Sequence, residues 1–277
     1  MKRYKNHPLS LILFLLVNLA AVITAAVVLF LIGYILWHGV PNLSLPGIFA
    51  WEYNGENQSM TPAIINTLIM TALTLLLAVP IGVFAAIYLV EYSKKGSRLV
   101  KLIRVTAETL VGIPSIVYGL FGFIVFVITL GWSYTLIAGV ITLAIMILPL
   151  IIRTTEEALM AVSDSFREGS FGLGAGKLRT VFRIVLPSAV PGIAAGIILA
   201  IGRIVGESAA LIFTSGTNPV VAKGLFTSAS TLSVHLYALL TEGLYTEQAY
   251  AVAAVLLFLV IGINALSSVA AKKLTAK

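Results

Sequence analysis

Cysteine is absent from the 277-residue sequence, and charged residues are scarce. Without thiols the chain can form neither a disulfide framework nor a thiolate metal site. Charged side chains make up 10% of the sequence, whereas about a quarter of a typical soluble domain is charged. Hydrophobic residues make up 59%, in runs well beyond the ~18 residues that indicate a membrane span. The composition therefore predicts a membrane protein.

Six apolar runs of sufficient length follow one another and predict an all-α integral membrane protein with six transmembrane helices. The first run is about twice as long as the apolar core of a secretory signal peptide, so we interpret it as a retained span. Polar loops and basic segments separate the later runs. The predicted spans are 9–37, 63–90, 113–130, 134–152, 189–213 and 248–270.

These spans suggest a division of the chain into three parts. Residues 1–62 comprise the N-terminal tail, the first span and an external loop. Residues 63–270 form the membrane core, which includes a long polar loop at 153–188, and residues 271–277 form a C-terminal tail. The polar loop is the longest segment between spans that no membrane helix could absorb. This loop is therefore a candidate for contact with another protein.

Basic residues are concentrated on one side of the six predicted spans. All but two of the 18 Lys and Arg residues fall in the two tails, between the second and third spans, or in the 153–188 loop. Loops rich in Lys and Arg stay in the cytoplasm, so both termini and this loop are predicted to be cytoplasmic. Topology then explains the net charge of +7. A nucleic-acid role, which needs a basic face on a folded domain, is disfavoured.

The 153–188 loop predicts three short helices. Thr154 and Glu157 have the spacing of a capping box, and Ser165 and Glu168 repeat that spacing. Apolar side chains recur at helical intervals after each of these starts, but the loop has no core of its own in which to bury them. The pattern predicts an amphipathic surface that docks on a partner protein.

Three glycines before Lys177 resemble a phosphate-binding loop only superficially. A P-loop would also need glycine at position 171, Ser or Thr at position 178 and a preceding strand. The sequence has Phe171 and Leu178 at these positions. We interpret the glycines as a turn at Gly174, followed by a helix that Pro187 ends. The chain itself is expected to bind no nucleotide.

The remaining polar residues form no catalytic or metal-binding pattern. The histidines His7, His38 and His235 lie in tails or external segments without paired ligand spacing, so no metal site is predicted. Ser208 and Ser215 have no base close to them in sequence, so nucleophilic catalysis is not predicted either. We expect a chain without a cofactor and without enzymatic activity.

Arg203 and Glu207 are charged residues inside the fifth predicted span. Their spacing of four would place them on one face of a helix. A charge at the bilayer centre costs about 2.5–3.5 kcal/mol on insertion scales, so it is retained only where it faces protein or an aqueous path. The planar guanidinium of Arg203 suits an oxyanion. Two interpretations remain: a structural ion pair, or a gate at which an anion competes with Glu207 for Arg203.

Small and polar residues occur inside two other predicted spans. In the third span, Pro114 and several glycines predict a kink with close helix packing. Alternatively, this span is broken and presents backbone N–H groups to an anion. In the second span, hydrogen bonds between helices are predicted for four polar side chains: Asn66, Thr67, Thr71 and Thr74.

The segment EGSFGLGAGKLRTVFRIVLP resembles the EAA loop of ATP-binding-cassette importer permeases. That motif has Glu-Ala-Ala, three residues, Gly, nine residues, Ile, one residue and Leu-Pro. The small residues Gly169 and Ser170 replace its two alanines. The motif positions are occupied here by Glu168, Gly174, Ile184, Leu186 and Pro187.

Three further blocks, 112–122, 202–216 and 233–243, are similar to the phosphate-importing branch of this family. Ala210 stands where that branch more often has proline. The resemblance implies a type I, MetI-like permease of the bacterial cytoplasmic membrane that moves inorganic phosphate. Two alternatives remain open: a permease for another oxyanion such as molybdate or sulfate, or a non-transporting membrane scaffold or sensor.

The resemblance also implies partners and roles. A second, similar permease subunit would complete the pathway, a dimer of separate ATPase subunits would use ATP and Mg, and an extracytoplasmic phosphate-binding protein would deliver the substrate. Arg203 would help to pass the anion, and Glu207 would pair with Arg203 when the site is empty. The residues expected to couple the chain to the ATPase are Glu168, Phe171, Leu173, Gly174, Ile184, Leu186 and Pro187.

Overall fold

The computed structural model describes residues 8–54, 57–94 and 96–275, and within these ranges every regular element is helical. The predicted basic positions Lys2, Arg3, Lys5 and Lys95 lie outside the described residues, as does His7. Three of the elements, labelled η, are π-helical turns. The elements are α1 (Pro8–Asn42), α2 (Thr61–Ile87), η2 (Tyr88–Tyr92), α3 (Arg98–Val111), α4 (Ser115–Gly122), η3 (Phe123–Thr129), α5 (Leu136–Met160), α6 (Asp164–Gly172), α7 (Lys177–Thr180), η4 (Val181–Val185), α8 (Leu186–Val205), α9 (Ala209–Thr214), α10 (Leu232–Glu242) and α11 (Thr246–Thr275).

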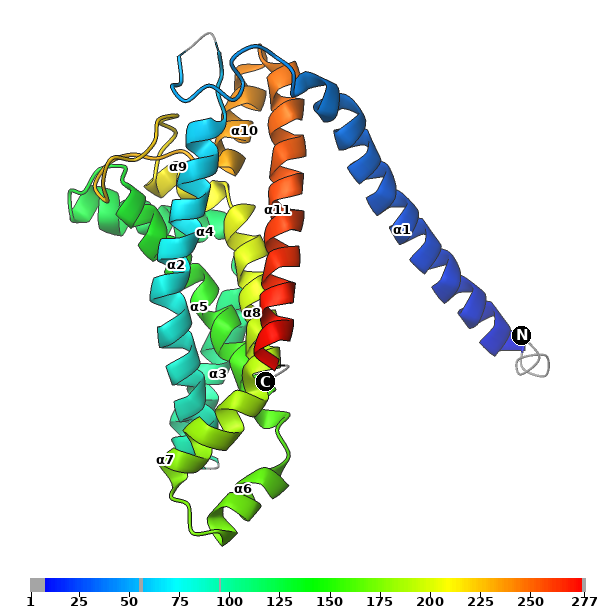
Figure 1. Ribbon diagram of the computed structural model, residues 1–277, viewed down its shortest axis with the longest axis vertical. Helices are drawn as coiled ribbons and strands as arrows, with labels where there is room; N and C mark the ends of the chain where they lie inside the picture. Colours follow the sequence, from blue (N-terminus) through cyan, green and yellow to red (C-terminus); the bar gives the residue numbers. More distant parts are fainter. Residues whose placement is uncertain (1–7, 55–56, 95, 276–277) are drawn as a thin grey trace.

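The long helices α2, α5, α8 and α11 make up the central bundle (Figure 1). α5 packs against α2 on one side and α8 on the other, and α11 packs against α8. Leu143 and Ile147 of α5 are fully buried in a core that α5 shares with α2 and α8. A Cβ atom on Gly82 of α2 would lie 2.6 Å from Cγ2 of Ile151, so only glycine permits the observed approach of α2 to α5.

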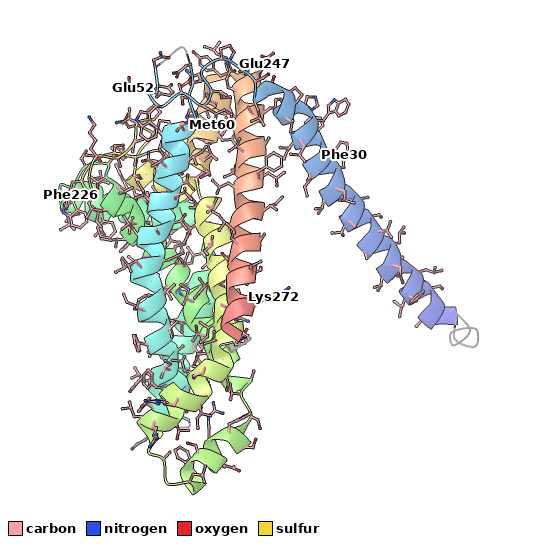
Figure 2. All side chains as sticks on the ribbon, in the orientation of Figure 1. Phe30, Glu52, Met60, Phe226, Glu247 and Lys272 are labelled. Atoms are coloured by element: carbon pink, nitrogen blue, oxygen red, sulfur yellow. The ribbon has the colours of Figure 1, made fainter. Side chains whose placement is uncertain are left out.

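α1 diverges from this bundle along most of its length (Figure 1). It contacts α11 near its C-terminal end, where a Cβ atom on Gly39 would clash with the Tyr250 backbone and the ring of His38 lies 5.1 Å from that of Tyr250. Farther back along α1, apolar side chains such as Phe30 project away from the other helices (Figure 2). An apolar helix of this length with no protein around it is covered by lipid or by a neighbouring chain.

The third predicted span corresponds to the second of two helical segments that meet at a sharp bend. α3 and the continuous α4–η3 segment meet at an angle of 102°. Pro114 stands at the break, where it has no N–H to donate and its ring excludes the preceding residue from helical geometry. The described residues contain five helices that are long and apolar enough to cross a membrane, or six if the bent pair counts as one span. The chain bends at Pro114 as predicted, and residues 98–111, to which the sequence analysis assigned no span, form the helix α3.

Two predictions for the 153–188 loop are wrong. α5 continues to Met160, so Thr154 lies inside this helix, where its hydroxyl donates to the Leu150 carbonyl at 3.0 Å instead of capping a new helix. Pro187 does not end the third short helix, because α7, η4 and α8 form one continuous apolar helix, Lys177–Val205. Leu186 N–H bonds to Val181 O, five residues back, and this wide π turn directly before Pro187 accommodates the proline ring. Of the three expected short helices, α6 alone is separate.

Candidate functional site

α6 and its flanking turns extend beyond the end of the bundle (Figure 1). The Ser163 hydroxyl caps this helix by accepting a hydrogen bond from Ser165 N–H, so the cap is two residues earlier than the predicted one at Ser165. Phe166 and Phe171 are exposed on α6, and Leu173, just beyond its end, is 91% exposed. Large apolar side chains at a protruding tip form a surface suited to another protein.

Gly174 terminates α6 in the left-handed conformation, with φ of 81°. Its N–H donates to Phe171 O at 2.9 Å, and the N–H of Ala175 donates to Ser170 O at 3.1 Å. These two bonds form a Schellman motif, the helix ending that glycine favours because it has no Cβ. The predicted turn at Gly174 is confirmed, and it places Leu173 at the apex of the segment.

The seven predicted coupling residues do not form a single patch. Glu168, Phe171, Leu173 and Gly174 lie together on α6 and its C-terminal turn. Ile184 and Leu186 are half-buried on the stem that returns to the bundle, and Leu186 packs against a buried cluster. Pro187 is exposed on the same stem. The protruding surface therefore comes from the first half of the motif, and the second half anchors it.

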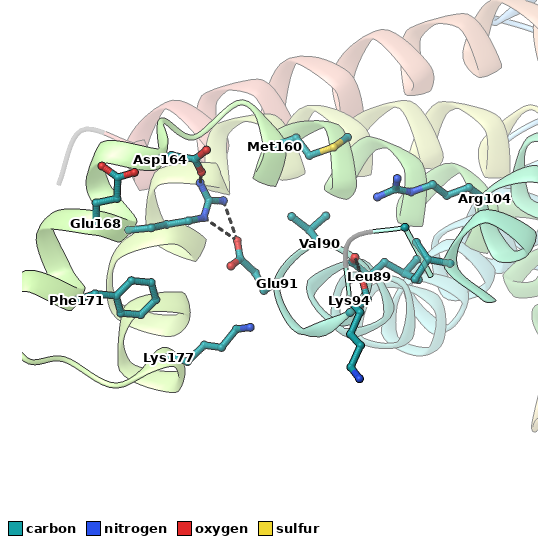
Figure 3. Close-up of a pocket in the computed structure, with 14 residues that line it drawn as sticks. Leu89, Val90, Glu91, Lys94, Arg104, Met160, Asp164, Glu168, Phe171 and Lys177 are labelled. Carbon is teal, nitrogen blue, oxygen red and sulfur yellow. Dashed lines mark hydrogen bonds and ion pairs between the residues drawn. The ribbon is translucent and has the colours of Figure 1, made fainter. Parts of the chain in front are cut away.

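Arg167 is a contact residue that the sequence analysis missed. Its Nε and Nη2 donate to Glu91 Oε1 at 3.1 and 2.7 Å. Nη1 donates to Val162 O at 2.8 Å and to Asp164 Oδ1 at 3.1 Å, and Nη2 also donates to Leu159 O at 3.0 Å. Glu91 and Asp164 converge on this guanidinium in Figure 3. No local signal could have revealed this contact, because Glu91 precedes Arg167 by 76 residues.

A cavity of about 730 Å³ opens beside this contact, between η2, α3 and α6 (Figure 3). Its lining carries both signs of charge, with Glu91 and Glu168 among the acids and Lys94, Arg104 and Lys177 among the bases. Two of these bases are already engaged: Arg104 bonds to Glu156 at 3.1 Å, and Lys177 Nζ lies 5.1 Å from the ring centroid of Tyr92. The balanced lining gives no preference for an anionic or a cationic ligand.

Arg203 and Glu207 do not share a helical face, so this expectation is wrong. α8 ends at Val205, and Glu207 lies in the break before α9. Glu207 Oε1 accepts a hydrogen bond from the N–H of Ala210 at 3.1 Å, and its backbone carbonyl accepts one from the Ser233 hydroxyl. No ion pair joins Arg203 to Glu207 in the part of the chain that the structure describes.

The helix break at 206–208 lies next to α4. A Cβ atom on Gly119 would come within 2.8 Å of Ala210 Cα, so α4 approaches the α9 backbone through this glycine. The Tyr118 hydroxyl donates to Leu110 O at 2.8 Å across the α3–α4 bend. The glycine-packing interpretation of the third span is thus confirmed for Gly119.

Polar residues of α2 hold the external segment between α9 and α10. Asn66 Nδ2 donates to Val220 O and Ser230 O at 2.9 and 3.1 Å, and its Oδ1 accepts from Ala222 N–H. Thr67 accepts from Leu232 N–H at 2.8 Å. The long-range hydrogen bonds predicted for these two residues are present, but they go to backbone groups of the segment and the start of α10. The buried hydroxyls of Thr71 and Thr74 have no hydrogen-bond partner among the described residues.

Comparison with known proteins assigns the family. Residues 78–275 match the family described as binding-protein-dependent transport system inner membrane component. The chain belongs to this family. Its relatives include the probable ABC transporter permease protein YqgI of Bacillus subtilis, which is 34% identical over 83% of each chain. The phosphate transport system permease protein PstA of Mycobacterium leprae is 34% identical over 80% of this chain and 72% of its own length.

A further relative, PstA 1 of Mycobacterium tuberculosis, is 39% identical over 62% of this chain and 55% of its own length. Two solved structures share the fold. The MetNI methionine ABC transporter matches with a TM-score of 0.62 and 20% identity, covering 78% of this chain and 94% of its own. A bacterial alginate ABC transporter matches with a TM-score of 0.61 and 18% identity, covering 94% and 96%.

Membership of the binding-protein-dependent transport family confirms the predicted class. The chain is a multi-pass component of the cytoplasmic membrane with the MetI-like permease fold, and it is the non-catalytic membrane subunit of its transport system. The matched residues include α5 through α11 and therefore both candidate regions, α6 with its turns and the break at 206–208. A system of this kind also contains a substrate-binding protein and an ATPase.

Proposed function

We propose that this chain is a permease subunit of an ATP-driven importer of inorganic phosphate. The observation that carries the proposal is the protruding α6 surface, because exposed apolar side chains at the tip of a membrane protein need a partner to cover them. Family membership makes a separate ATPase the natural partner for that surface. Relatives named as PstA phosphate permeases, at 34–39% identity, support phosphate as the substrate.

The ATPase docks on the α6 side, with Phe171 and Leu173 in the interface and Gly174 fixing the turn between them and the stem. The ATPase, not this chain, holds ATP and Mg. The end of the molecule that carries α6 faces the cytoplasm, which is consistent with the basic residues of the 153–188 loop. A second permease subunit lies alongside and contributes the other half of the pathway. A phosphate-binding protein delivers the substrate from the opposite side.

Arg203 is the anion contact of this chain. It lies partly buried in the last turn of α8, where the helix dipole favours a positive charge, and it forms no ion pair within the described ranges. A guanidinium in this condition retains donors for an oxyanion. Glu207, four residues after Arg203, belongs to the same gate region, where its carboxylate accepts a hydrogen bond from Ala210 N–H in the first turn of α9.

Reconstitution tests the proposal. The chain is purified with its partner permease, ATPase and binding protein, and the complex is placed in liposomes. Radiolabelled phosphate is added on the side of the binding protein, and ATP is supplied on the side of the ATPase. We expect ATP-dependent phosphate accumulation that excess sulfate or molybdate does not inhibit, and none with a hydrolysis-deficient ATPase. Accumulation of sulfate or molybdate instead of phosphate would show that the substrate is another oxyanion. Absence of any flux with all partners present would indicate a scaffold or sensor.

A further inference from the structure

We infer that Arg167 is a positioning residue that fastens α6 to the ends of two membrane helices, so that a displacement of α6 by the ATPase moves α2 and α5 with it. This inference rests on the proposed function, because it explains how movement of a docked ATPase reaches the membrane. It concerns residues outside the docking surface itself, which is exposed and apolar.

The guanidinium joins three segments of the chain. Through Glu91 it holds η2, which continues α2 into a single helix from Thr61 to Tyr92. Through the Leu159 carbonyl it holds the last turn of α5. The residue itself lies in the first turn of α6. Five hydrogen bonds use all five N–H donors of the side chain, a geometry that the fixed fork of arginine provides and the point charge of lysine does not.

Burial distinguishes this contact from an ordinary surface ion pair. The side chains of Arg167 and Glu91 are 15% and 8% exposed, so water and salt screen their attraction only weakly. Asp164, the other carboxylate on the same guanidinium, is 81% exposed and lies on α6 itself, so it connects no second helix. The link between α6 and α2 therefore depends on Glu91.

α6 is also held to the stem by an independent contact. Ser170 and Thr180 share a buried hydrogen bond between their hydroxyls at 2.8 Å, which connects α6 to α7. Since α7 continues without interruption into α8, this contact ties α6 to a third membrane helix. Without Arg167, α6 therefore stays attached to α8. It loses its link to α2, and its link to α5 is weaker.

The first experiment measures phosphate transported per ATP hydrolysed in the complete reconstituted complex. Because single positions on a coupling route change coupling by 0.5–2 kcal/mol, we expect Arg167→Ala to lower this ratio by about tenfold. Glu91→Ala should lower it by a similar factor, and the double variant should resemble either single variant, because both changes remove the same link. Glu157→Ala is the matched control: it breaks another Arg–Glu pair, at 3.0 Å, that is exposed and confined to α5. Its ratio should stay within about twofold of wild type.

A covalent bridge tests whether the link itself matters. The chain has no cysteine, so Glu91→Cys with Arg167→Cys introduces its only thiols. A flexible bis-methanethiosulfonate reagent that joins the two thiols should restore the transport ratio that the unbridged double variant has lost. A reductant, which cleaves the bridge, should lower the ratio again. Each single cysteine variant, treated identically, should show no recovery. A bridged protein with no recovery would contradict the inference even if Arg167→Ala fails to assemble.

A second measurement does not depend on the substrate. Hydrogen exchange at 83–92, the end of the α2–η2 helix, is followed in the assembled complex with and without bound ATP. ATP should change this exchange in wild type and Glu157→Ala but not in Glu91→Ala. A persistent change in Glu91→Ala would overturn the inference. If wild type shows the ATP effect but transports no phosphate, the proposed substrate is wrong while the coupling role of Arg167 stands.

Discussion

Arg167 and Arg203 are two arginines in opposite conditions. Arg167 is almost buried and all of its N–H donors are engaged by backbone and carboxylate oxygens of its own chain. Arg203 is also partly buried, at a helix end beside the helix break at 206–208, but no hydrogen bond or ion pair engages it within the described residues. A fully engaged guanidinium holds structure together, whereas an unengaged one is available for an anion. Under the two proposals, the same residue type fastens helices in one place and binds the anion in the other.

The largest effect is expected at Arg203. Arg203→Ala should reduce phosphate uptake by about a hundredfold, since a charge-assisted hydrogen bond contributes roughly 1.5–3 kcal/mol and more than one donor would contact the anion. The amounts of assembled complex and the hydrogen exchange of α6 should not change. Arg203→Lys keeps the charge but not the planar donor fork. Its phosphate uptake should lie between that of wild type and that of Arg203→Ala. Unaltered uptake by Arg203→Ala at normal subunit levels would refute its role as the anion contact.

Glu207 does not pair with Arg203; its carboxylate accepts a hydrogen bond from α9 instead. Glu207→Ala should lower the free energy of unfolding by about 2 kcal/mol, because the buried N–H of Ala210 would lose its acceptor. Glu207→Gln keeps an acceptor oxygen and should cost less than half of this. Thermal unfolding in detergent measures both. Equal losses would mean that the negative charge, not the hydrogen bond to α9, is what stabilises the break.

Gly174 tests the docking surface independently of either arginine. Gly174→Asp forces a side chain into the left-handed region, which costs about 1–2 kcal/mol for residues with a Cβ, and places a charge beside Leu173. Co-purification with the ATPase should fall roughly tenfold on this estimate. Gly174→Ala adds the backbone strain without the charge, and no neighbouring atom lies within 4 Å of its Cβ. Normal co-purification and coupling of both variants would refute the assignment of this turn to the interface.

The smallest effect is expected at Arg153. Its bond to Glu157 at 3.0 Å resembles the contact of Arg167 in distance, but the two side chains are 53% and 59% exposed. Thermal unfolding of Arg153→Ala in detergent should therefore match that of wild type, because water and salt screen an exposed pair within a helix. A thermal shift comparable to that of Arg167→Ala would show that burial is not what separates these contacts.

Elements that depend on local pattern could be predicted from the sequence. Long apolar runs located α2, α5 and α11, because no soluble structure could accommodate them. The spacing from Glu168 to Gly174 located the exposed helix and its left-handed ending, because both depend on neighbouring residues. The expected domain limits at 62 and 270 and the cytoplasmic position of the termini stay predictions.

Elements that depend on distant contacts could not be predicted. Thr154 has capping spacing, but the packing of α5 into the bundle extends the helix past it, and its hydroxyl then bonds within the helix. The break after Val205 precedes α9, whose backbone α4 approaches through Gly119, and the sequence near Arg203 does not indicate this distant contact. Arg167 finds its partner 76 residues away. Local spacing predicts the exposed α6 surface, whereas tertiary packing determines which charged side chains are paired.

Leu173 has a consequence for the life of the protein in the cell. This leucine is 91% exposed, and Phe171 close to it in sequence is exposed too, so both side chains stay in water until a partner covers them. Under the proposed function, a copy of this chain made in excess of its ATPase keeps that apolar surface in water. Excess copies should then self-associate through this turn more readily than copies assembled with the ATPase.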